Sequence, residues 1–256
     1  MVLAIETQQL TRFFDTFCAV DHVDLKVERG TFYGFLDPNG AGKSTTIKML
    51  TGLLAPTEGR ITVLGKNPLR PSEALQVKRK IGVVSEDLAL FDNLMAREYL
   101  TFVGRMYLLP RQTIQSRIDD LLSLMRLADD EKKLTLEFSH GMKKKLALSA
   151  ALLPNPDLLF LDEPFEGVDA VTSRVIRDVL SSYVSRGSTV FLTSHILEIV
   201  EKLCTHVGII AQGKLVEQAS LQEIHSGGSL EDRFLEIVGS DPAATEQLSW
   251  LDESGS

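Results

Sequence analysis

A short stretch that combines glycines with a lysine and two hydroxyl residues carries the strongest chemical signal in the sequence. It reads Asp37-Pro38-Asn39-Gly40-Ala41-Gly42-Lys43-Ser44-Thr45. An apolar run precedes it and a helical pattern follows, and a glycine turn between a strand and a helix can cradle phosphate groups with main-chain N–H groups. Lys43 would reach the β- and γ-phosphates, and the Ser44 hydroxyl would bind Mg²⁺. We therefore predict a nucleoside triphosphate site here.

Asp37 stands where the phosphate-loop pattern G-x-x-x-x-G-K-[ST] has glycine. A carboxylate that faced the phosphates at about 5 Å would cost roughly 3 kcal/mol per unit charge at an effective dielectric of about 20. We therefore expect the Asp37 side chain to point outward and to bond to its own loop, as aspartates do in turns. The expected consequence is a site that binds its nucleoside triphosphate with moderately reduced affinity.

Apolar runs elsewhere in the chain end in polar residues that could do chemistry. These are Glu86 after the run 81–84, Asp162 and Glu163 after 158–161, and His195 after 189–193. Runs without alternation are typical of central parallel strands, and such sheets bind ligands at the carboxyl ends of their strands. We expect Asp162 to hold Mg²⁺, directly or through water, and Glu163 to act as the general base. Glu86 is either a metal ligand or a solvated loop acid.

Two other groups of residues have ordinary structural interpretations. Phe13, Phe14 and Phe17 are core residues on sequence alone, although one of them could stack on an adenine ring. Ser139 is a candidate N-cap for a helix that runs to Pro154. The lysines at 143–145 in that helix are expected to lie on its solvated face.

The remaining pattern alternates strands and helices. Strands are expected over 3–10, 19–35, 60–65 and 81–84, a helix over 46–54, helices through 88–151, and a helix from Asp169 to Gly187. Residues 207–211 and 214–217 flank Gln212-Gly213 and predict a hairpin. Residues 220–238 are amphipathic, and 239–256 are polar and predict a loose tail.

Composition excludes several classes of protein. The chain has 256 residues, of which 44% are hydrophobic and 24% charged, as in ordinary globular proteins. The net charge of −8 argues against broad contact with nucleic acid. No apolar run approaches the roughly 18–20 residues that span a bilayer, and no signal peptide is evident. Cys18 and Cys204 are predicted to be reduced core thiols of a cytosolic protein.

The order and spacing of the motifs resemble the nucleotide-binding subunit of an ATP-binding cassette (ABC) transporter, over about residues 3–220. Residues 37–45 are similar to Walker A, Glu86 to the Q-loop glutamine, 138–142 to the signature, 158–163 to Walker B, 166–169 to the D-loop, His195 to the switch histidine and Phe14 to the A-loop aromatic. The match at Phe14 favours stacking on adenine for this residue.

The resemblance implies the fold. We expect an α/β protein with a P-loop core, in which a mostly parallel sheet is flanked by helices. An N-terminal antiparallel β subdomain and an inserted α-helical subdomain of about residues 88–152 would complete an ATPase domain over 1–220. Residues 221–256 would form a helical extension and a tail.

The resemblance also implies mechanism and partners. Two cassettes, identical or different, would dimerise head to tail around two ATP molecules, with Ser139 and the Gly141 N–H meeting the γ-phosphate bound by the other subunit. Glu163 would activate water, His195 would contact the γ-phosphate, and Mg²⁺ would lie at Ser44, Glu86 and Asp162. Separate membrane-spanning permease subunits would hold the chain at the cytoplasmic face of the membrane.

Departures from the family pattern leave alternatives. Glu86 replaces glutamine, and in the signature His140 replaces glycine and Met142 replaces glutamine. Asp37 and His140 favour a degenerate regulatory cassette that binds nucleotide but hydrolyses ATP poorly, whereas the intact Lys43, Ser44, Asp162, Glu163 and His195 oppose it. A soluble ABC ATPase without a transport role is the other alternative. The run 40–59 looks like that of ABC-2-type exporters and favours export.

Overall fold

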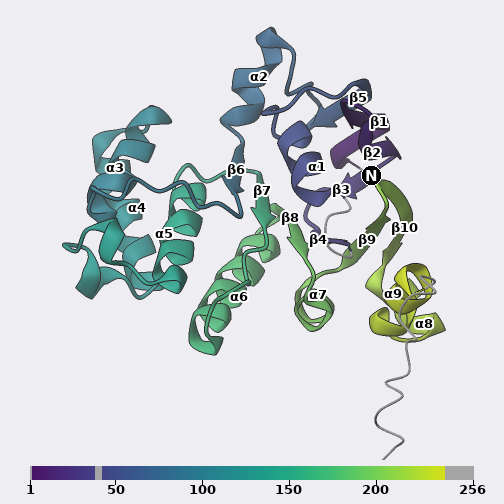
Figure 1. Ribbon diagram of the computed structural model, residues 1–256. Coiled ribbons are helices and arrows are strands. Elements are labelled where there is room, and N and C mark those ends of the chain that lie inside the picture. Colours follow the sequence, from purple (N-terminus) through teal and green to yellow (C-terminus); the bar gives the residue numbers. More distant parts are fainter. Residues whose placement is uncertain (1, 38–41, 240–256) are drawn as a thin grey trace, which may run out of the picture.

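A six-stranded sheet forms the centre of the protein, as the computed structural model shows for residues 2–37 and 42–239 (Figure 1). Its strand order is β10-β9-β4-β8-β7-β6. The bounds are β4 Phe32–Leu36, β6 Ile81–Val84, β7 Leu158–Asp162, β8 Thr189–Ser194, β9 His206–Ala211 and β10 Lys214–Ser220. Pairing is parallel from β6 to β9, and only β10 runs antiparallel to its neighbour β9. Every residue of β4, β7 and β8 is buried, as expected for strands covered on both faces.

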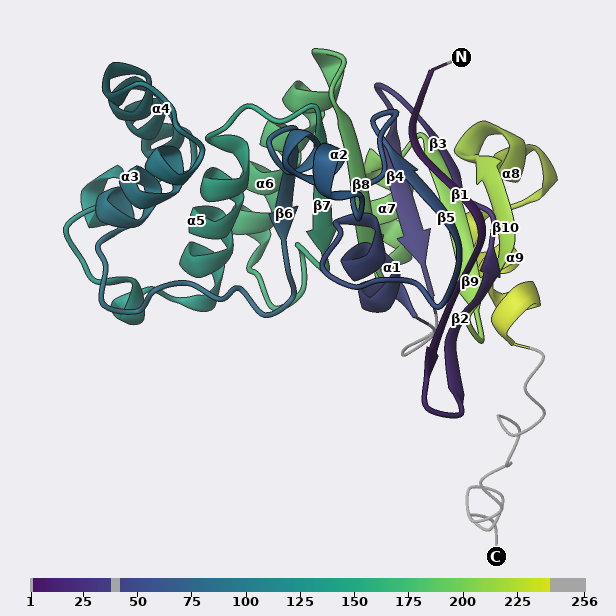
Figure 2. The ribbon, with the colours of Figure 1, turned by 90° about the horizontal axis from the view of Figure 1, so that it is seen from above.

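A second sheet is antiparallel and lies beside the first (Figure 2). It contains β1 Leu3–Phe14, β2 Phe17–Val23, β3 Lys26–Glu28 and β5 Glu58–Val63. Strand β1 pairs with each of the other three strands. The predicted N-terminal antiparallel subdomain is therefore confirmed.

Two groups of helices pack around these sheets. Helices α3, α4 and α5 gather beyond β6 at one end of the molecule, which confirms the inserted helical subdomain (Figures 1 and 2). Their bounds are α3 Ala96–Met106, α4 Arg111–Leu124 and α5 His140–Leu152, with short 3₁₀ turns at Ala128–Asp130 and Thr135–Glu137. The others are α1 Lys43–Leu50, α2 Pro71–Lys78, α6 Ala170–Ser185, α7 Leu197–Leu203, α8 Leu221–Gly227 and α9 Leu230–Val238. In the part of the chain described here, no helix combines the length and the apolar composition that crossing a bilayer requires.

The central sheet separates two hydrophobic cores because successive side chains of a strand point to opposite faces. Phe32 and Leu36 of β4 pack in the core shared with the helical group, whereas Tyr33 and Phe35 pack in the core under the antiparallel sheet. In the second core the ring of Phe191 stacks on Tyr33, with centroids 5.4 Å apart. This packing fixes β4 firmly just before the phosphate loop.

Local signals in the sequence account for most element ends. Ser139 caps α5, with its Oγ accepting from the Met142 N–H at 3.3 Å, and Asp169 caps α6 by accepting from Val171 and Thr172. Gln212 and Gly213 both have positive φ, which confirms the hairpin between β9 and β10. Helix α1 begins at Lys43, three residues before the expected 46, and α2 was not expected at all. The division at residue 220 stays a prediction, and the predicted tail lies outside the described residues.

Candidate active site

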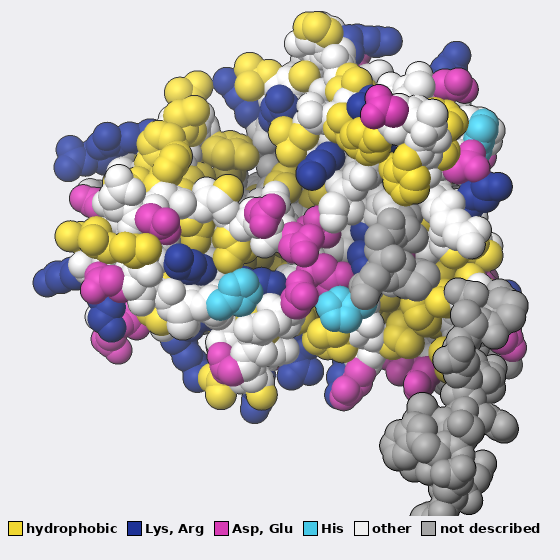
Figure 3. Space-filling view, in the orientation of Figure 1, with side chains coloured by type: hydrophobic (Ala, Val, Ile, Leu, Met, Phe, Trp, Pro, Cys, Tyr) yellow, Lys and Arg dark blue, Asp and Glu magenta, His cyan; other side chains and the backbone are white. Residues whose placement is uncertain are grey.

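The carboxyl ends of the central strands open into one cavity of about 470 Å³, a size typical of small-molecule sites. Acidic side chains and histidines gather at the centre of this face (Figure 3). The lining residues come from five parts of the chain: Phe14, Phe17 and Ala19; Asp37, Gly42, Lys43, Ser44 and Thr45; Glu86; Glu163 and Glu166; and His195. The structure thus brings together most of the residues singled out in the sequence. Pro38, Asn39, Gly40 and Ala41 lie outside the described residues.

Lys43 lies between two carboxylates at the start of α1. Its Nζ contacts Oδ1 of Asp37 and lies 3.1 Å from Oε1 of Glu163. Burial alone would lower the pKa of Lys43, but the hydrogen bonds and charges of Asp37 and Glu163 outweigh this effect and raise it. The ammonium is therefore charged and ready to meet an anion.

The expectation that Asp37 points outward is wrong. Its side chain is only 1% exposed and is directed at Lys43. The expectation considered repulsion between Asp37 and the phosphates but left out the lysine of the same loop. A buried ammonium attracts the nearest carboxylate, because an unpaired charge in the interior is costly.

Glu163 is held at both its main-chain and its side-chain atoms. Its N–H donates to Thr193 Oγ1 at 3.0 Å, and its carbonyl accepts from Lys144 Nζ. Its Oε2 lies 3.1 Å from Nδ1 of His195, while Oε1 meets Lys43. The two predicted catalytic side chains, Glu163 and His195, are therefore in contact.

Phe14 and Phe17 flank the turn between β1 and β2 and line the cavity rather than the core. They are 43% and 63% exposed, so either can offer a ring face to a flat ligand. The Arg12 guanidinium lies 4.7 Å from the centre of the Phe14 ring and covers one of its faces. Stacking on Phe14 stays a prediction, and Phe17 is a second candidate that the sequence alone did not favour.

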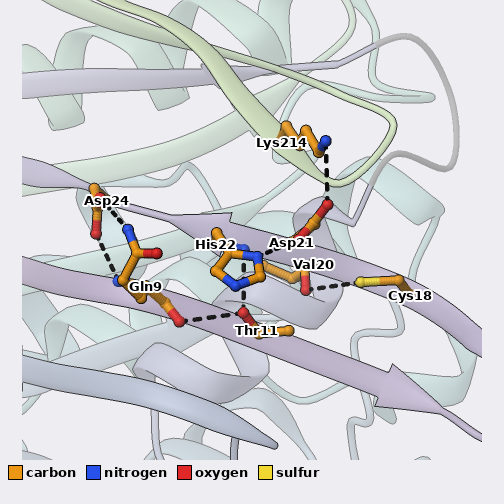
Figure 4. A network of polar contacts seen from close by, with 8 residues as sticks. All are labelled: Gln9, Thr11, Cys18, Val20, Asp21, His22, Asp24 and Lys214. Atoms are coloured by element: carbon orange, nitrogen blue, oxygen red, sulfur yellow. Dashed lines mark hydrogen bonds and ion pairs between the residues drawn. The ribbon is translucent and has the colours of Figure 1, made fainter.

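A polar network anchors this hairpin to the central sheet (Figure 4). Asp21 in β2 pairs with Lys214 at 3.3 Å, and its N–H donates to the Gly213 carbonyl at 2.8 Å. Hydrogen bonds from His22 and Lys214 lower the pKa of Asp21, so its carboxylate stays charged. The network thereby fixes the position of the two phenylalanines relative to the phosphate loop.

The signature segment lies apart from the cavity of its own chain. Ser139 and Gly141 do not line the cavity, and Gly141 is packed against Thr172 and Asp169. Their predicted contact with a nucleotide held by a second subunit is not tested by this arrangement and stays a prediction. The expectation for the lysines that follow is wrong, because Lys144 and Lys145 are buried. Helix α5 packs against β6, α3 and α6, so most of its residues are buried.

The predicted metal ligands fit Mg²⁺ by their chemistry. Ser44 and Glu86 line the cavity, and the buried Asp162 carboxylate accepts a hydrogen bond from Thr193 at 2.6 Å. Among the described residues, no cluster of three or more His, Cys, Asp or Glu side chains could hold a metal by itself. Mg²⁺ commonly takes only one or two protein oxygens and completes its shell with phosphate oxygens and water. The donor set therefore suits a metal that enters together with a nucleotide.

The fold and the cavity define a P-loop nucleotide-binding protein. Residues 20–166 match the family model described as ABC transporter. The chain therefore belongs to the ABC transporter family, as the resemblance predicted.

Similar proteins agree with this assignment. The bacitracin transport ATP-binding protein BcrA of Bacillus licheniformis is 40% identical over 219 residues, which cover 85% of this chain and 70% of that protein. The daunorubicin resistance ATP-binding protein DrrA3 of Streptomyces coeruleorubidus is 37% identical over 232 residues, which cover 90% of this chain and 73% of that protein. A solved ATP-binding subunit of an ABC transporter superposes with a TM-score of 0.85 at 28% identity, covering 92% of this chain and 99% of that one. The chain is thus similar to ATP-binding subunits of transporters of the exporter type.

Sequence reasoning missed a role for Glu166 and for Lys144. Glu166 was noted only as part of the D-loop, yet it lines the cavity. Lys144 was assigned to a solvated face, yet it reaches the main chain of Glu163. The position of Glu166 three residues after Glu163 could have suggested the first, but nothing local in the sequence indicates the second.

Proposed function

We propose that this chain binds and hydrolyses ATP and powers export through separate membrane-spanning subunits. The observation that carries the proposal is the meeting of Lys43, Glu163 and His195 at one cavity directly after the strand ends. Export is supported by relatives whose names concern bacitracin transport and daunorubicin resistance. The transported substrate would be set by the membrane-spanning subunits.

The proposed reaction uses Lys43, Glu163 and His195, and the carboxylate of Glu163 already contacts the other two at the cavity. Lys43 would exchange its carboxylate partners for the β- and γ-phosphates and neutralise charge there. Glu163 would then accept a proton from the attacking water at the oxygen that Lys43 leaves. His195 would hold the other oxygen of Glu163 and face the γ-phosphate. Mg²⁺, held through Ser44, Glu86 and Asp162, would supply charge neutralisation to the phosphates.

We further propose a head-to-tail dimer of cassettes at the cytoplasmic face of a membrane. Ser139 and Gly141 lie outside the cavity of their own chain, so a second subunit is the natural recipient of the Ser139 hydroxyl and the Gly141 N–H. Closure on ATP and reopening after hydrolysis would drive the permease subunits. Co-purification of a membrane protein with the tagged full-length chain tests the partnership, and recovery of the chain alone from membrane extracts would contradict it.

The decisive experiment measures the rate of ATP hydrolysis by the wild-type chain and by Glu163→Gln. Each is assayed alone and together with the membrane protein that co-purifies. Hydrolysis should fall by about a hundredfold or more, because a general base is lost, while ATP binding is retained. Glu198→Gln is the matched control, since Glu198 is exposed and pairs with Lys202 on α7. A wild-type rate no higher than that of Glu163→Gln would contradict hydrolysis and favour a regulatory cassette.

A further inference from the structure

The backbone of Glu163 has an unusual conformation. Its φ is +46°, in the left-handed region that residues with a side chain seldom adopt. Such strain costs on the order of 1–3 kcal/mol and persists only where the surroundings impose it. Some contact of the Glu163 main chain must therefore hold this conformation.

Side chains from two other elements form hydrogen bonds with the N–H and the carbonyl of Glu163. Thr193 at the end of β8 accepts from its N–H at 3.0 Å. Lys144 from the second turn of α5 donates to its carbonyl at 2.5 Å. The first contact comes from the neighbouring strand of the sheet, whereas the second comes from the inserted helical subdomain. The general base is thus oriented partly by a residue of the signature helix.

Lys144 is also surrounded by acids. Its side chain is almost completely enclosed, with 4% of its surface exposed. Burial lowers its pKa, and the charges of Glu166, Glu163, Glu86 and Asp162 act in the opposite direction. An ammonium has three N–H donors, and within the described residues one of them is taken, by the Glu163 carbonyl. The remaining donors can serve the carboxylates around it.

We propose that Lys144 is a positioning residue for the proposed hydrolysis, which fixes the main chain of Glu163 and offsets the negative charge of the surrounding carboxylates. The inference rests on the proposed function, because it assigns Glu163 the role of base. Lys144 acts through Glu163 and is not among the residues that line the cavity. It also ties the signature helix to the strand end that carries the base, so a shift of one would move the other.

The adjacent Lys145 provides a matched control. It lies on the same helix and is also buried, but its charged neighbours are Asp169, Asp130 and Arg126. It makes no contact with Glu163 among the interactions of the described residues. Replacement of either lysine by methionine removes a charge of similar burial from α5. Only the replacement of Lys144 should change the position of Glu163.

The experiment measures kcat, KM and thermal stability of full-length Lys144→Met, Lys144→Arg and Lys145→Met. We expect Lys144→Met to lower kcat by roughly tenfold or more, because small displacements of a catalytic group cost this much, with KM changed less than about threefold. Lys144→Arg should recover most of kcat, since it restores a charged donor. Lys145→Met should keep the wild-type kcat. A wild-type kcat in folded Lys144→Met, or equal losses in both methionine variants, would refute the inference.

A crystal structure of Lys144→Met separates this inference from the proposed function. Glu163 should leave the left-handed region and its side chain should move away from His195. If φ stays near +46° with both side-chain contacts intact, the positioning role is refuted whether or not the chain hydrolyses ATP. If Glu163 moves but the wild-type chain proves inactive, the proposed function fails and the structural inference stands. Lys144→Gln replaces the methionine variant in both measurements if the latter does not fold.

Discussion

Replacement of Asp37 by Asn removes one of the two carboxylates that hold the Lys43 ammonium. Asp37 is buried and contacts Nζ, and Glu163 lies 3.1 Å from the same atom. One positive charge therefore faces two negative ones. A nucleotide that claims Lys43 must separate it from Asp37 and leave that carboxylate buried beside the phosphates. The asparagine variant keeps the shape of the side chain and leaves Lys43 paired one to one with Glu163.

The magnitude follows from opposing electrostatic effects. A pair of unit charges about 4 Å apart interacts by about 4 kcal/mol at an effective dielectric of 20. Most of this attraction is regained when Lys43 moves from Asp37 to a phosphate. The cost of binding is therefore only the part of the attraction to Asp37 that the phosphate does not replace. The remaining repulsion between Asp37 and the phosphates is further reduced by Mg²⁺ and Lys43. We expect a net gain of about 1 to 2 kcal/mol for Asp37→Asn, or roughly 5- to 30-fold tighter binding of ATP.

Calorimetric titration of the full-length chain with ATP and Mg²⁺ measures this difference in Kd. Asp157→Asn is the matched control, because it removes a carboxylate from an exposed pair with Lys80, 3.5 Å away. Its Kd should equal that of the wild type. An unchanged or higher Kd in Asp37→Asn would refute the view that Asp37 competes with the nucleotide for Lys43. Loss of folding in the variant would show instead that the ion pair is needed for stability.

Three further predictions concern the fold and the phosphate loop. The Tyr33 hydroxyl is buried and has no partner within the described residues, so Tyr33→Phe should keep or raise Tm, by up to about 2–4 °C in thermal unfolding. Burial raises the pKa of Tyr183 to about 12 from 10.0; the folded state thus holds the proton longer, and stability is lost as pH rises from 10 to 12. A rise of two pKa units equals about 2.7 kcal/mol, reduced to about 1 kcal/mol by partial exposure. Because about half of this loss falls between pH 9 and 11, urea unfolding of Tyr183→Phe at these two pH values should show about 0.5 kcal/mol less loss than that of the wild type. Gly42 has φ +105°, and a Cβ there would lie 2.3 Å from the Ala19 carbonyl, so Gly42→Ala should lower Tm and abolish ATP binding in the same titration; a wild-type Kd would contradict this.

Strands and their ends could be predicted because their signals are local. The run 157–163 produced β7 Leu158–Asp162, and parallel pairing of β7 with β8 placed Glu163 and His195 at the same edge. Helix α2 was missed for a physical reason. Only Val77 is buried on it, so its sequence carries no amphipathic pattern, and Pro71 marks its start without predicting its continuation.

Side-chain directions could not be predicted where distant residues decide them. Asp37 turned inward because Lys43 is a better partner than water, and that depends on how deeply the loop is buried. The lysines of α5 were assigned to solvent from their type, but the burial of Lys144 depends on where β7 and α6 pack. Phe14 is less exposed than Phe17, and the Arg12 guanidinium lies over the Phe14 ring. Each outcome is set by tertiary contacts between segments far apart in the sequence.

Glu163 has two main-chain contacts that the fold fixes and two carboxylate contacts at the cavity. Thr193 accepts a hydrogen bond from its N–H, and Lys144 donates one to its carbonyl. Lys43 and His195 contact its carboxylate oxygens at 3.1 Å each, and Lys43 is the partner whose charge attracts phosphate. A nucleotide would thus take Lys43 from one carboxylate oxygen, while His195 keeps the other oxygen and the main chain stays in place. The base would become available for water only when phosphate has taken Lys43, which would couple its activation to occupancy of the site.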